Sequence, residues 1–491
     1  MLADIGVTGA RGALDEADLL VDRAYVAGEW LKGNSAPIAV DDPFTLETFG
    51  EIPNLGAAET ARAIEAAADA LPAWAARTAR ERGQILRRWF DLIVRHREDL
   101  ARLITRENGK TIGEARGEVD YGASFLELYA EEGARQLGEI IPPPVPGRRL
   151  MVEREPVGVC AAITPWNFPL AMLTRKVGPA LAAGCTIVAK PAELTPLTAL
   201  AFAKLGEEAG VPAGVVSVIT GKSTPIGETL CNSMVVRKLS FTGSTHVGAM
   251  LAAACAPTIK RLGLELGGNA PLLVFDDADL GKAVEAALVA KFRNGGQSCV
   301  AANRIYVQKG IKDRFVAAFA EKVGAMKAGD GFDADSNIGP LINAAGVAKV
   351  AEHRDEATQN GARIVAQGTG QGERIFAPTL VADVARDALV TREETFGPLA
   401  AVIDFATVEE GLKLANATPF GLATYLCSED PSTIARVSRG LEAGMVGINT
   451  GLISTAVAPF GGVKMSGLGR EGSAHGLAEY QNLKYICHAG L

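Results

Sequence analysis

Three short stretches of the sequence contain residue types that together could perform chemistry on a thiol. Cys299 follows the glycine pair of Asn294-Gly295-Gly296, which ends a helix that apolar spacing predicts over residues 279 to 292. A thiol on a short loop beyond a helix is placed to meet a ligand. Most cysteines, however, are small buried residues of a core, and Cys299 considered alone favours that interpretation.

Two further stretches of the sequence favour a catalytic role for Cys299 instead. Glu265 lies in an apolar segment before two glycines, and burial of an unpaired carboxylate raises its pKa towards that of a usable base. Asn167 lies between Pro165 and Pro169, which restrict the backbone and make its amide a rigid donor. A nucleophile, a tunable base and a preorganised amide are the parts of thiol-based acyl chemistry. The sequence therefore predicts that Cys299, Glu265 and Asn167 are catalytic.

The composition limits the class of protein. A chain of 491 residues is too long for one ordinary core and should fold as two or three domains. Its hydrophobic content of 48% is typical of a globular α/β protein, and its net charge of −8 argues against nucleic acid as a partner. The seven cysteines are scattered without CxxC spacing, so we expect neither disulfides nor a metal site, and a cytoplasmic location.

The pattern of apolar runs predicts the elements that position these residues. Residues 57 to 108 and 112 to 137 are strongly helical, and the proline-rich run 141 to 146 is an extended arm or a plain linker. Short strands then alternate with helices, which predicts parallel sheets. The expected strands are 157–163, 185–189, 215–219 and 238–241, then 271–275, 305–308, 400–405, 423–427 and 445–449. The first twenty residues have no long apolar core, so we expect no signal peptide.

Two places in the first α/β run could bind a nucleotide. Gly243 and Ser244 follow a predicted strand and open a helix, whose N-terminal amides could hold a pyrophosphate, although an ordinary tight turn explains them equally well. Lys190 and Glu193 follow the strand ending at residue 189, where α/β sheets bind ligands; a surface salt bridge is the alternative.

These motifs, in this order, resemble the aldehyde dehydrogenase superfamily from about Tyr25 to the C-terminus. The resemblance is carried by Pro165-Trp166-Asn167-Phe168-Pro169, Lys190-Pro191-Ala192-Glu193, Phe241-Thr242-Gly243-Ser244-Thr245, Glu265-Leu266-Gly267-Gly268, Gly296-Gln297-Ser298-Cys299, Glu394-Thr395-Phe396-Gly397-Pro398 and Pro459-Phe460-Gly461-Gly462. It implies an α/β fold with a variant Rossmann NAD-binding domain (1–127 and 147–264), an α/β catalytic domain (265–465) and a small oligomerisation element (128–146 and 466–491). We therefore expect a homodimer or homotetramer.

The resemblance also implies roles for individual residues. Cys299 would attack an aldehyde, Asn167 would hold the oxyanion and Glu265 would activate water. The implied cofactor residues are Trp166, Lys190, Glu193, Gly243, Ser244, Glu394 and Phe396. In the family the acid at Glu193 takes the adenosine ribose hydroxyls, which favours NAD and leaves NADP as the alternative. Lys464 and Glu471 match family positions near the base, without an assigned role.

Three further residues indicate the substrate class. Arg175, Arg293 and Ser454 lie on motifs that frame the expected cavity, and guanidinium matches a carboxylate in bidentate geometry. Either arginine alone would be explained by a surface ion pair. Together they resemble the succinate-semialdehyde dehydrogenases within the superfamily. Two positions after Cys299 the sequence departs from the animal members, because Ala301 replaces their second cysteine.

Three alternatives stay open at this point. Glutarate semialdehyde is one methylene longer than succinate semialdehyde, and an apolar pocket separates such neighbours by only about 10–200-fold. A thiol esterase without a cofactor would use the same three catalytic residues, but the nucleotide motifs argue against it. A protein that only binds a ligand would not need the complete catalytic set.

Overall fold

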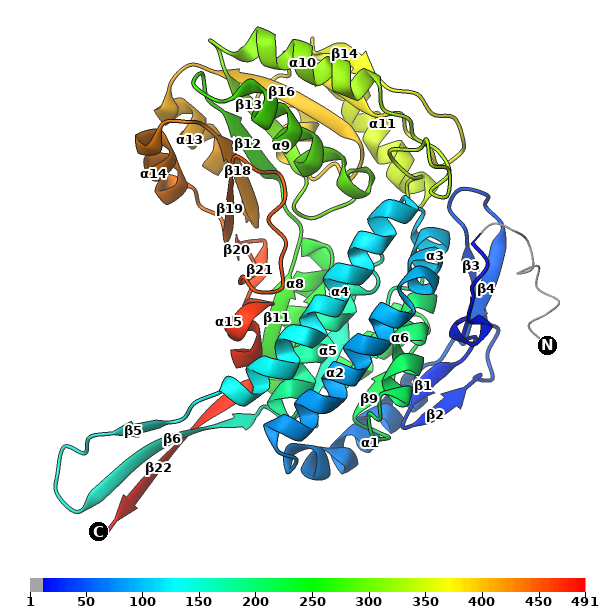
Figure 1. The fold of residues 1–491 in the computed structure, drawn as a ribbon, viewed down its shortest axis with the longest axis vertical. Helices are drawn as coiled ribbons and strands as arrows, with labels where there is room; N and C mark the ends of the chain where they lie inside the picture. The colour runs from blue at the N-terminus through cyan, green and yellow to red at the C-terminus, as the bar shows by residue number, and fades with distance from the viewer. Residues whose placement is uncertain (1–11, 491) are drawn as a thin grey trace.

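The computed structural model describes residues 12–490 and arranges them as two α/β units and a projecting hairpin (Figure 1). Residues 1–11 lie outside the described residues. They include the start of the expected NAD-binding domain and part of the N-terminal stretch in which we expect no signal peptide. Among residues 12–490, no helix is long and apolar enough to cross a membrane.

The first unit contains an eight-stranded sheet whose five central strands are parallel. The strands, in spatial order, are β2 (Glu29–Leu31), β1 (Ala24–Val26), β9 (Val216–Val218), β8 (Thr186–Lys190), β7 (Val159–Ile163), β10 (Val236–Thr242), β11 (Arg261–Glu265) and β21 (Gly467–Leu468). The strands predicted in this region are confirmed, because each is a short buried run bounded by turn residues. The antiparallel strands β1 and β21 flank the parallel ones.

Helices cover both faces of this sheet, as the alternation of buried side chains along its strands requires. One face packs against α5 (Ala171–Ala183) and α6 (Leu197–Glu208), with α2 (Ala79–Arg95), α3 (Arg97–Asn108) and α4 (Ile112–Glu132) outside them. The other face packs against α1 (Ala57–Ala75), α7 (Ser223–Asn232) and α8 (Thr245–Cys255). The helix predicted to end at residue 137 ends at Glu132, followed by the short 3-10 turn η2 (Gly133–Arg135).

The second unit has the same construction around a seven-stranded sheet, parallel except for its edge strand β14. Its strands are β14 (Arg363–Gln367), β15 (Thr379–Ala382), β16 (Leu399–Phe405), β13 (Ala302–Gln308), β12 (Ala270–Val274), β18 (Ala423–Cys427) and β19 (Met445–Ile448). The helices α9 (Leu280–Phe292) and α10 (Lys312–Gly324) cover one face. The helices α11 (Ala344–Gln359), α12 (Leu389–Arg392), α13 (Val408–Asn416) and α14 (Pro431–Gly440) cover the other.

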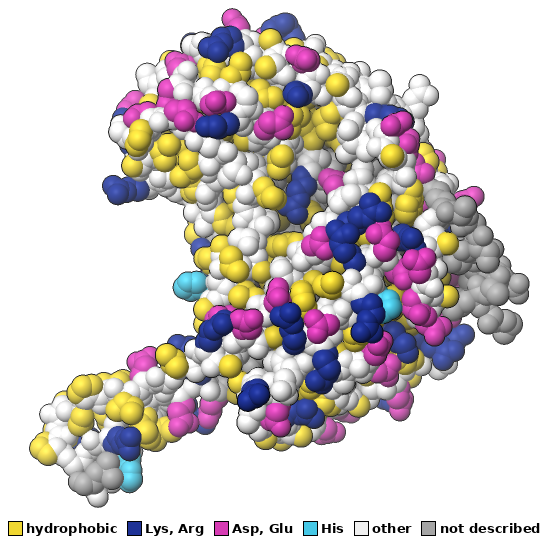
Figure 2. Space-filling model, in the orientation of Figure 1, with side chains coloured by type: hydrophobic (Ala, Val, Ile, Leu, Met, Phe, Trp, Pro, Cys, Tyr) yellow, Lys and Arg dark blue, Asp and Glu magenta, His cyan; other side chains and the backbone are white. Residues whose placement is uncertain are grey.

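A long hairpin projects from the first unit. It contains β5 (Glu139–Ile141), β6 (Arg148–Pro156) and β22 (Gln481–Ala489), which pairs with β6 along its whole length. The boundary expected at residue 147 therefore falls inside this hairpin, between β5 and β6. Apolar side chains lie exposed on it, including Ile140, Leu483 and Tyr485 (Figure 2).

The remaining described elements are short. They are the pairs β3 (Ile38–Asp41) with β4 (Thr48–Ile52) and β17 (Phe420–Gly421) with β20 (Val463–Lys464), the helix α15 (Ser473–Ala478), and the turns η1 (Ala17–Leu19), η3 (Ala256–Thr258) and η4 (Arg293–Gly296).

Strand register brings the motifs of the first unit to one edge of its sheet. Ile163 is paired with both Lys190 and Phe241, and Thr242 is paired with Glu265. The strand ends at Ile163, Lys190, Thr242 and Glu265 are therefore adjacent, because the carboxyl ends of parallel strands meet at one edge.

The second unit contributes the opposite, amino-terminal edge of its sheet. The segments before β12, β13 and β16 contain Gly268, Cys299 and Glu394, and these three strands are parallel neighbours. A site between the two edges can therefore collect residues from distant parts of the chain.

Candidate active site

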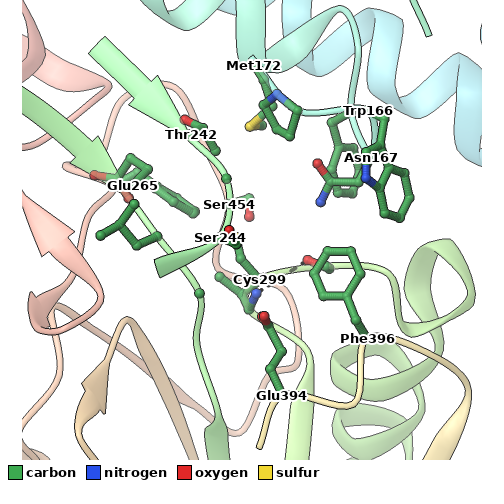
Figure 3. Close-up of a pocket in the computed structure, with 18 of the residues that line it drawn as sticks. Trp166, Asn167, Met172, Thr242, Ser244, Glu265, Cys299, Glu394, Phe396 and Ser454 are labelled. Atoms are coloured by element: carbon green, nitrogen blue, oxygen red, sulfur yellow. Dashed lines mark hydrogen bonds between the residues drawn. The ribbon is translucent and has the colours of Figure 1, made fainter. Parts of the chain in front are cut away.

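A cavity of about 270 Å³ lies between the two sheet edges (Figure 3). It is lined by Cys299, Glu265, Asn167, Trp166, Gly243, Ser244, Glu394, Phe396, Arg175, Arg293 and Ser454, which are the predicted site residues other than Lys190 and Glu193. Buried polar atoms without a hydrogen-bond partner among residues 12–490 gather there, including Thr242 Oγ1, Asn167 Oδ1 and both Glu265 carboxylate oxygens. Because unpaired buried polar groups are costly, this concentration indicates a ligand site.

Cys299 is held on a loop that needs left-handed backbone. Asn294, Gly295 and Gly296 all have φ between 54° and 73°. A Cβ on Gly296 would lie 2.3 Å from the carbonyl oxygen of Gly397, so this position requires glycine. The helix therefore stops where predicted, and Cys299 follows in a turn closed by the Ala301 amide donating to the Ser298 carbonyl at 3.0 Å.

The Cys299 thiol is protonated at neutral pH without help. Burial raises its pKa to about 12, and the nearby Arg175 charge opposes that shift only in part. A thiolate is the reactive form of cysteine. Attack by Cys299 therefore needs a group that removes its proton.

Glu265 has the environment of a strong base. Its carboxylate is 2% exposed, and burial, with Glu471 nearby, raises its pKa well above the usual value. Behind it Glu471 forms ion pairs with Arg175 and Lys176. Against the effect of burial, these two cations hold the pKa of Glu471 below its usual value. One acid of this pair is thus kept charged and the other is pushed towards neutrality.

Asn167 is positioned by more than its two prolines. Its backbone carbonyl accepts hydrogen bonds from Lys110 Nζ at 2.7 Å and from Asn294 Nδ2 at 3.0 Å. Its own Nδ2 donates to the Gln297 carbonyl at 3.1 Å. Lys110 is completely buried and pairs with Glu118 at 2.6 Å. The amide is therefore tied directly to the loop that carries Cys299.

The two predicted substrate arginines differ in their partners. Arg175, on α5, is 1% exposed, pairs with Glu471 and lies 4.4 Å from the centre of the Phe460 ring. Its Nη2 atom is buried without a hydrogen-bond partner among the described residues. Arg293 is half-buried 5.1 Å from the centre of the Phe168 ring, and no carboxylate between residues 12 and 490 pairs with it. Arg293 thus has its charge available to a ligand.

The aromatic and acidic residues expected at the nicotinamide lie together. Trp166 and Phe396 meet edge to face at 5.5 Å, and Phe396 adopts a left-handed φ of 55°. Such strain in a residue other than glycine gathers at ligand sites. Glu394 accepts a hydrogen bond from the Gly268 amide at 3.2 Å, and burial raises its pKa to about 7. Ser244 caps the N-terminus of α8 by accepting from the Val247 amide.

Lys190 and Glu193 lie outside the cavity, at the carboxyl end of β8. Lys190 Nζ lies 3.2 Å from Glu193 Oε1 and 2.7 Å from Ser223 Oγ, and Ser223 donates to Glu193 at 2.8 Å. Because β8, β7 and β10 are adjacent, this cluster and Ser244 lie along one sheet edge. An extended ligand could span both.

Sequence reasoning missed several residues of the site. Tyr121 and Lys349 also line the cavity, and Lys176 supports Glu471. None of them lies in a motif that signals chemistry, and only packing brings them to the site. Lys464, in contrast, donates to the carbonyls of Asn416 and Thr418 and pairs with Glu442, outside the cavity.

No group of three or more potential metal-ligating side chains occurs in residues 12–490. The site thus combines a thiol, a buried carboxylate and an amide. Aromatic and acidic side chains line the cavity beside them, at the edge of a parallel sheet where nucleotides bind. This is the arrangement of a cysteine-dependent oxidoreductase.

The chain belongs to the aldehyde dehydrogenase family, whose model matches residues 30–486. It is 53% identical to the glutarate-semialdehyde dehydrogenase of Pseudomonas putida, covering 96% of this chain and 99% of that protein. It is also 53% identical to the NADP(+) succinate-semialdehyde dehydrogenase of Escherichia coli K12, covering 96% and 99%. The crystal structure of succinate-semialdehyde dehydrogenase from Burkholderia pseudomallei superposes with a TM-score of 0.96 at 54% identity, covering 97% of this chain and 100% of that one. The expected family and fold class are confirmed, and the protein is an NAD(P)-dependent aldehyde dehydrogenase.

Proposed function

We propose that this enzyme oxidises an aldehyde that carries a distal carboxylate, with succinate semialdehyde as the substrate and succinate as the product. The observation that carries the proposal is Arg293, a cation without a carboxylate partner among the described residues, in the same cavity as Cys299. A carboxylate that enters a partly dry cavity loses its water and needs charge-assisted hydrogen bonds in return. Arg175 Nη2 and Ser454 supply further donors.

Glutarate semialdehyde is the alternative substrate. The relatives include enzymes named for each of the two semialdehydes at the same identity. One methylene changes the fit in an apolar cavity by only about 1–3 kcal/mol. We therefore expect both aldehydes to be turned over, with the shorter one preferred.

In the proposed mechanism Cys299 is the nucleophile and Glu265 removes its proton. The raised pKa of Glu265 makes it a competent acceptor near neutral pH. The new bond joins Sγ to the aldehyde carbon and places negative charge on the aldehyde oxygen. The Asn167 amide and the backbone N–H of Cys299 are the donors we assign to that oxygen.

Glu265 acts again in the second half of the reaction. Trp166, Glu394 and Phe396 would hold the nicotinamide end of NAD(P), which would supply the acceptor for the hydride of the carbon attached to Cys299, so that a thioester remains on Cys299. Glu265 then removes a proton from a water molecule as that water attacks the thioester carbonyl. The bond to Sγ breaks, the acid is released and the thiol is restored.

The residues of the site fit a dinucleotide. A Cβ on Gly267 would lie 3.1 Å from Glu394 Oε2 and 3.2 Å from Thr245 Oγ1, so glycine keeps this part of the cavity open. We assign Ser244 and Gly243 to the pyrophosphate, Glu394, Phe396 and Trp166 to the nicotinamide end, and Lys190 and Glu193 to the adenosine ribose. Because the Glu193 carboxylate would repel a 2′-phosphate, we expect NAD to be preferred over NADP.

We also propose that the enzyme works in the cytoplasm as a homodimer or homotetramer. All seven cysteines are free thiols, as a reducing compartment favours. The exposed apolar side chains of the hairpin suit packing against another subunit. Size-exclusion chromatography with light scattering tests the assembly.

The function is tested with the wild-type enzyme and four aldehydes: succinate semialdehyde, glutarate semialdehyde, butanal and benzaldehyde, each with NAD and NADP. We expect kcat/KM for succinate semialdehyde to exceed that for butanal by at least about tenfold, the value of one charge-assisted hydrogen bond. Equal values for succinate semialdehyde and butanal would disprove the assignment of an ω-carboxy substrate.

A further inference from the structure

Tyr121, on α4, presents a polar atom to the cavity that the proposed chemistry does not use. Its ring packs edge to face against Phe125 at 5.0 Å and against the small apolar group of Phe168, Ala171 and Met172. The ring is thus partly buried and held in place by these contacts. The hydroxyl is buried, its oxygen has the Arg175 guanidinium as a neighbouring donor, and its proton has no acceptor among residues 12–490.

A buried hydroxyl whose proton has no acceptor is unfavourable by about 1–3 kcal/mol. Phenylalanine would make the same ring contacts without this cost, so packing alone does not account for a tyrosine at position 121. An oxygen atom of a ligand in the cavity would satisfy the hydroxyl.

The charges around Tyr121 indicate which kind of ligand that is. Burial raises the pKa of Tyr121 above its usual value, and the charges of Arg175 and Arg293, with a hydrogen bond from Arg175 to the phenol oxygen, oppose this shift. The phenol therefore keeps its proton at neutral pH and acts as a donor. Neither guanidinium can accept that hydrogen bond. An anionic ligand attracted by Arg175 and Arg293 would bring acceptor oxygens within reach of the Tyr121 hydroxyl.

We propose that Tyr121 donates a hydrogen bond to the distal carboxylate of the substrate and is a specificity-determining residue alongside Arg293 and Arg175. This inference rests on the proposed function. Two arginines attract any small anion, whereas a hydroxyl on a packed ring donates from one direction. Tyr121 therefore selects for an anion at a particular depth in the cavity, and it separates ω-carboxy aldehydes from plain ones more sharply than the arginines do alone.

The chain supplies a matched control for this role. Tyr129 lies on the same helix, is completely buried and likewise has a backbone donor, Gly472, beside its oxygen but no acceptor for its proton among the described residues. It does not line the cavity. Tyr129→Phe removes an equivalent atom from the core, and Tyr121→Phe removes the atom that would meet the substrate. Because both changes delete one hydroxyl and keep the ring, both variants should fold.

The experiment measures kcat and KM for succinate semialdehyde and butanal in the wild type and in both variants. In Tyr121→Phe the ratio of the two kcat/KM values, succinate semialdehyde over butanal, should fall about tenfold, mainly through a higher KM for succinate semialdehyde. In Tyr129→Phe this ratio should equal that of the wild type.

Three results would overturn the inference. An unchanged ratio in Tyr121→Phe, while Arg293→Met lowers it, would reject the tyrosine and leave the proposed function standing. An equal fall for both aldehydes would show that Tyr121 only positions Arg175. A wild-type enzyme that does not prefer succinate semialdehyde to butanal would reject both the proposed function and the role of Tyr121.

Discussion

Arg175 and Arg293 line one cavity but lie in opposite electrostatic environments. Arg175 is buried on α5 against Glu471. Burial lowers the pKa of Arg175, but the charge of Glu471 outweighs this effect and holds that pKa above its usual value. Arg293 lies on the loop before Cys299, half-buried over the Phe168 ring, with no carboxylate partner in the described part of the chain. From sequence the two are indistinguishable, because each is an arginine on a motif near the nucleophile.

The difference shows how one residue type serves two purposes. A buried cation with a carboxylate partner is part of the scaffold, and removing it leaves an uncompensated charge. Here that charge would be Glu471, which would keep only Lys176 as a partner and lies next to Glu265. A half-buried cation without such a partner gains its hydrogen bonds from a ligand. We therefore expect Arg175 to support the catalytic carboxylate as well as substrate binding, and Arg293 to act on substrate choice alone.

Cys299→Ala should have the largest effect, because the proposed reaction begins at this thiol. NAD(P) reduction should be abolished with succinate semialdehyde and with butanal alike, while cofactor binding measured by fluorescence or calorimetry is kept. More than a few per cent of the wild-type turnover in this variant would show that another group is the nucleophile.

Glu265→Gln should stall the reaction after hydride transfer with either aldehyde, since the thioester could form but its hydrolysis would lack a base. Stopped-flow absorbance should show a burst of reduced cofactor, and mass spectrometry an acyl adduct on Cys299. If Glu265 also removes the thiol proton, the burst itself is slow. Normal steady-state turnover would place the base elsewhere.

The wild-type pH profile should reflect the raised pKa of Glu265. A base must be unprotonated to act, so kcat falls as pH decreases through that raised value, well above the usual range of a carboxylic acid. The pH dependence of kcat in the wild type, measured between pH 5 and 9, checks the direction. A profile that stays flat down to pH 5 would contradict a raised pKa for the base.

The arginine variants test the comparison directly. Arg293→Met should lower kcat/KM for succinate semialdehyde by roughly one to two decades, equivalent to about 1.5–3 kcal/mol, and affect butanal far less. Arg175→Met should slow both aldehydes and move the fall of kcat at low pH to higher pH. The variant loses a cation that lowers the pKa of Glu265, and it leaves Glu471 with Lys176 as its one cationic partner, so the pKa of Glu265 rises further. If both variants lost kcat/KM for the two aldehydes in the same proportion, the proposed difference between Arg175 and Arg293 would be wrong.

Ser454→Ala should have the smallest effect. A neutral hydroxyl contributes about 0.5–1.5 kcal/mol, so kcat/KM for succinate semialdehyde should fall by about two- to tenfold with little change for butanal. Steady-state kinetics with the two aldehydes measures this. A loss as large as that of Arg293→Met would make Ser454 an equal partner in anion binding.

The order of elements and the identity of the central chemical groups follow from local sequence. Glycines that accept left-handed backbone end α9 before Cys299, and short apolar runs bounded by turn residues predict four strands of the first sheet (β7, β8, β9, β10) and five of the second (β12, β13, β16, β18, β19). Glu265 stands out because a carboxylate in an apolar segment is unusual on physical grounds. These features depend on neighbours within a few residues, which the sequence displays directly.

Only the tertiary structure decided which distant groups meet. Glu471 pairs with Arg175 and Lys176, Lys110 fixes the backbone at Asn167, and Tyr121 reaches the cavity from α4, all without a local signal. The hairpin likewise unites β6 with β22, a pairing between segments more than 300 residues apart that no local pattern displays. The physical reason is that the availability of a charge depends on burial and on partners far away along the chain. Arg175 and Arg293 have the same side chain, and their different partners came from packing.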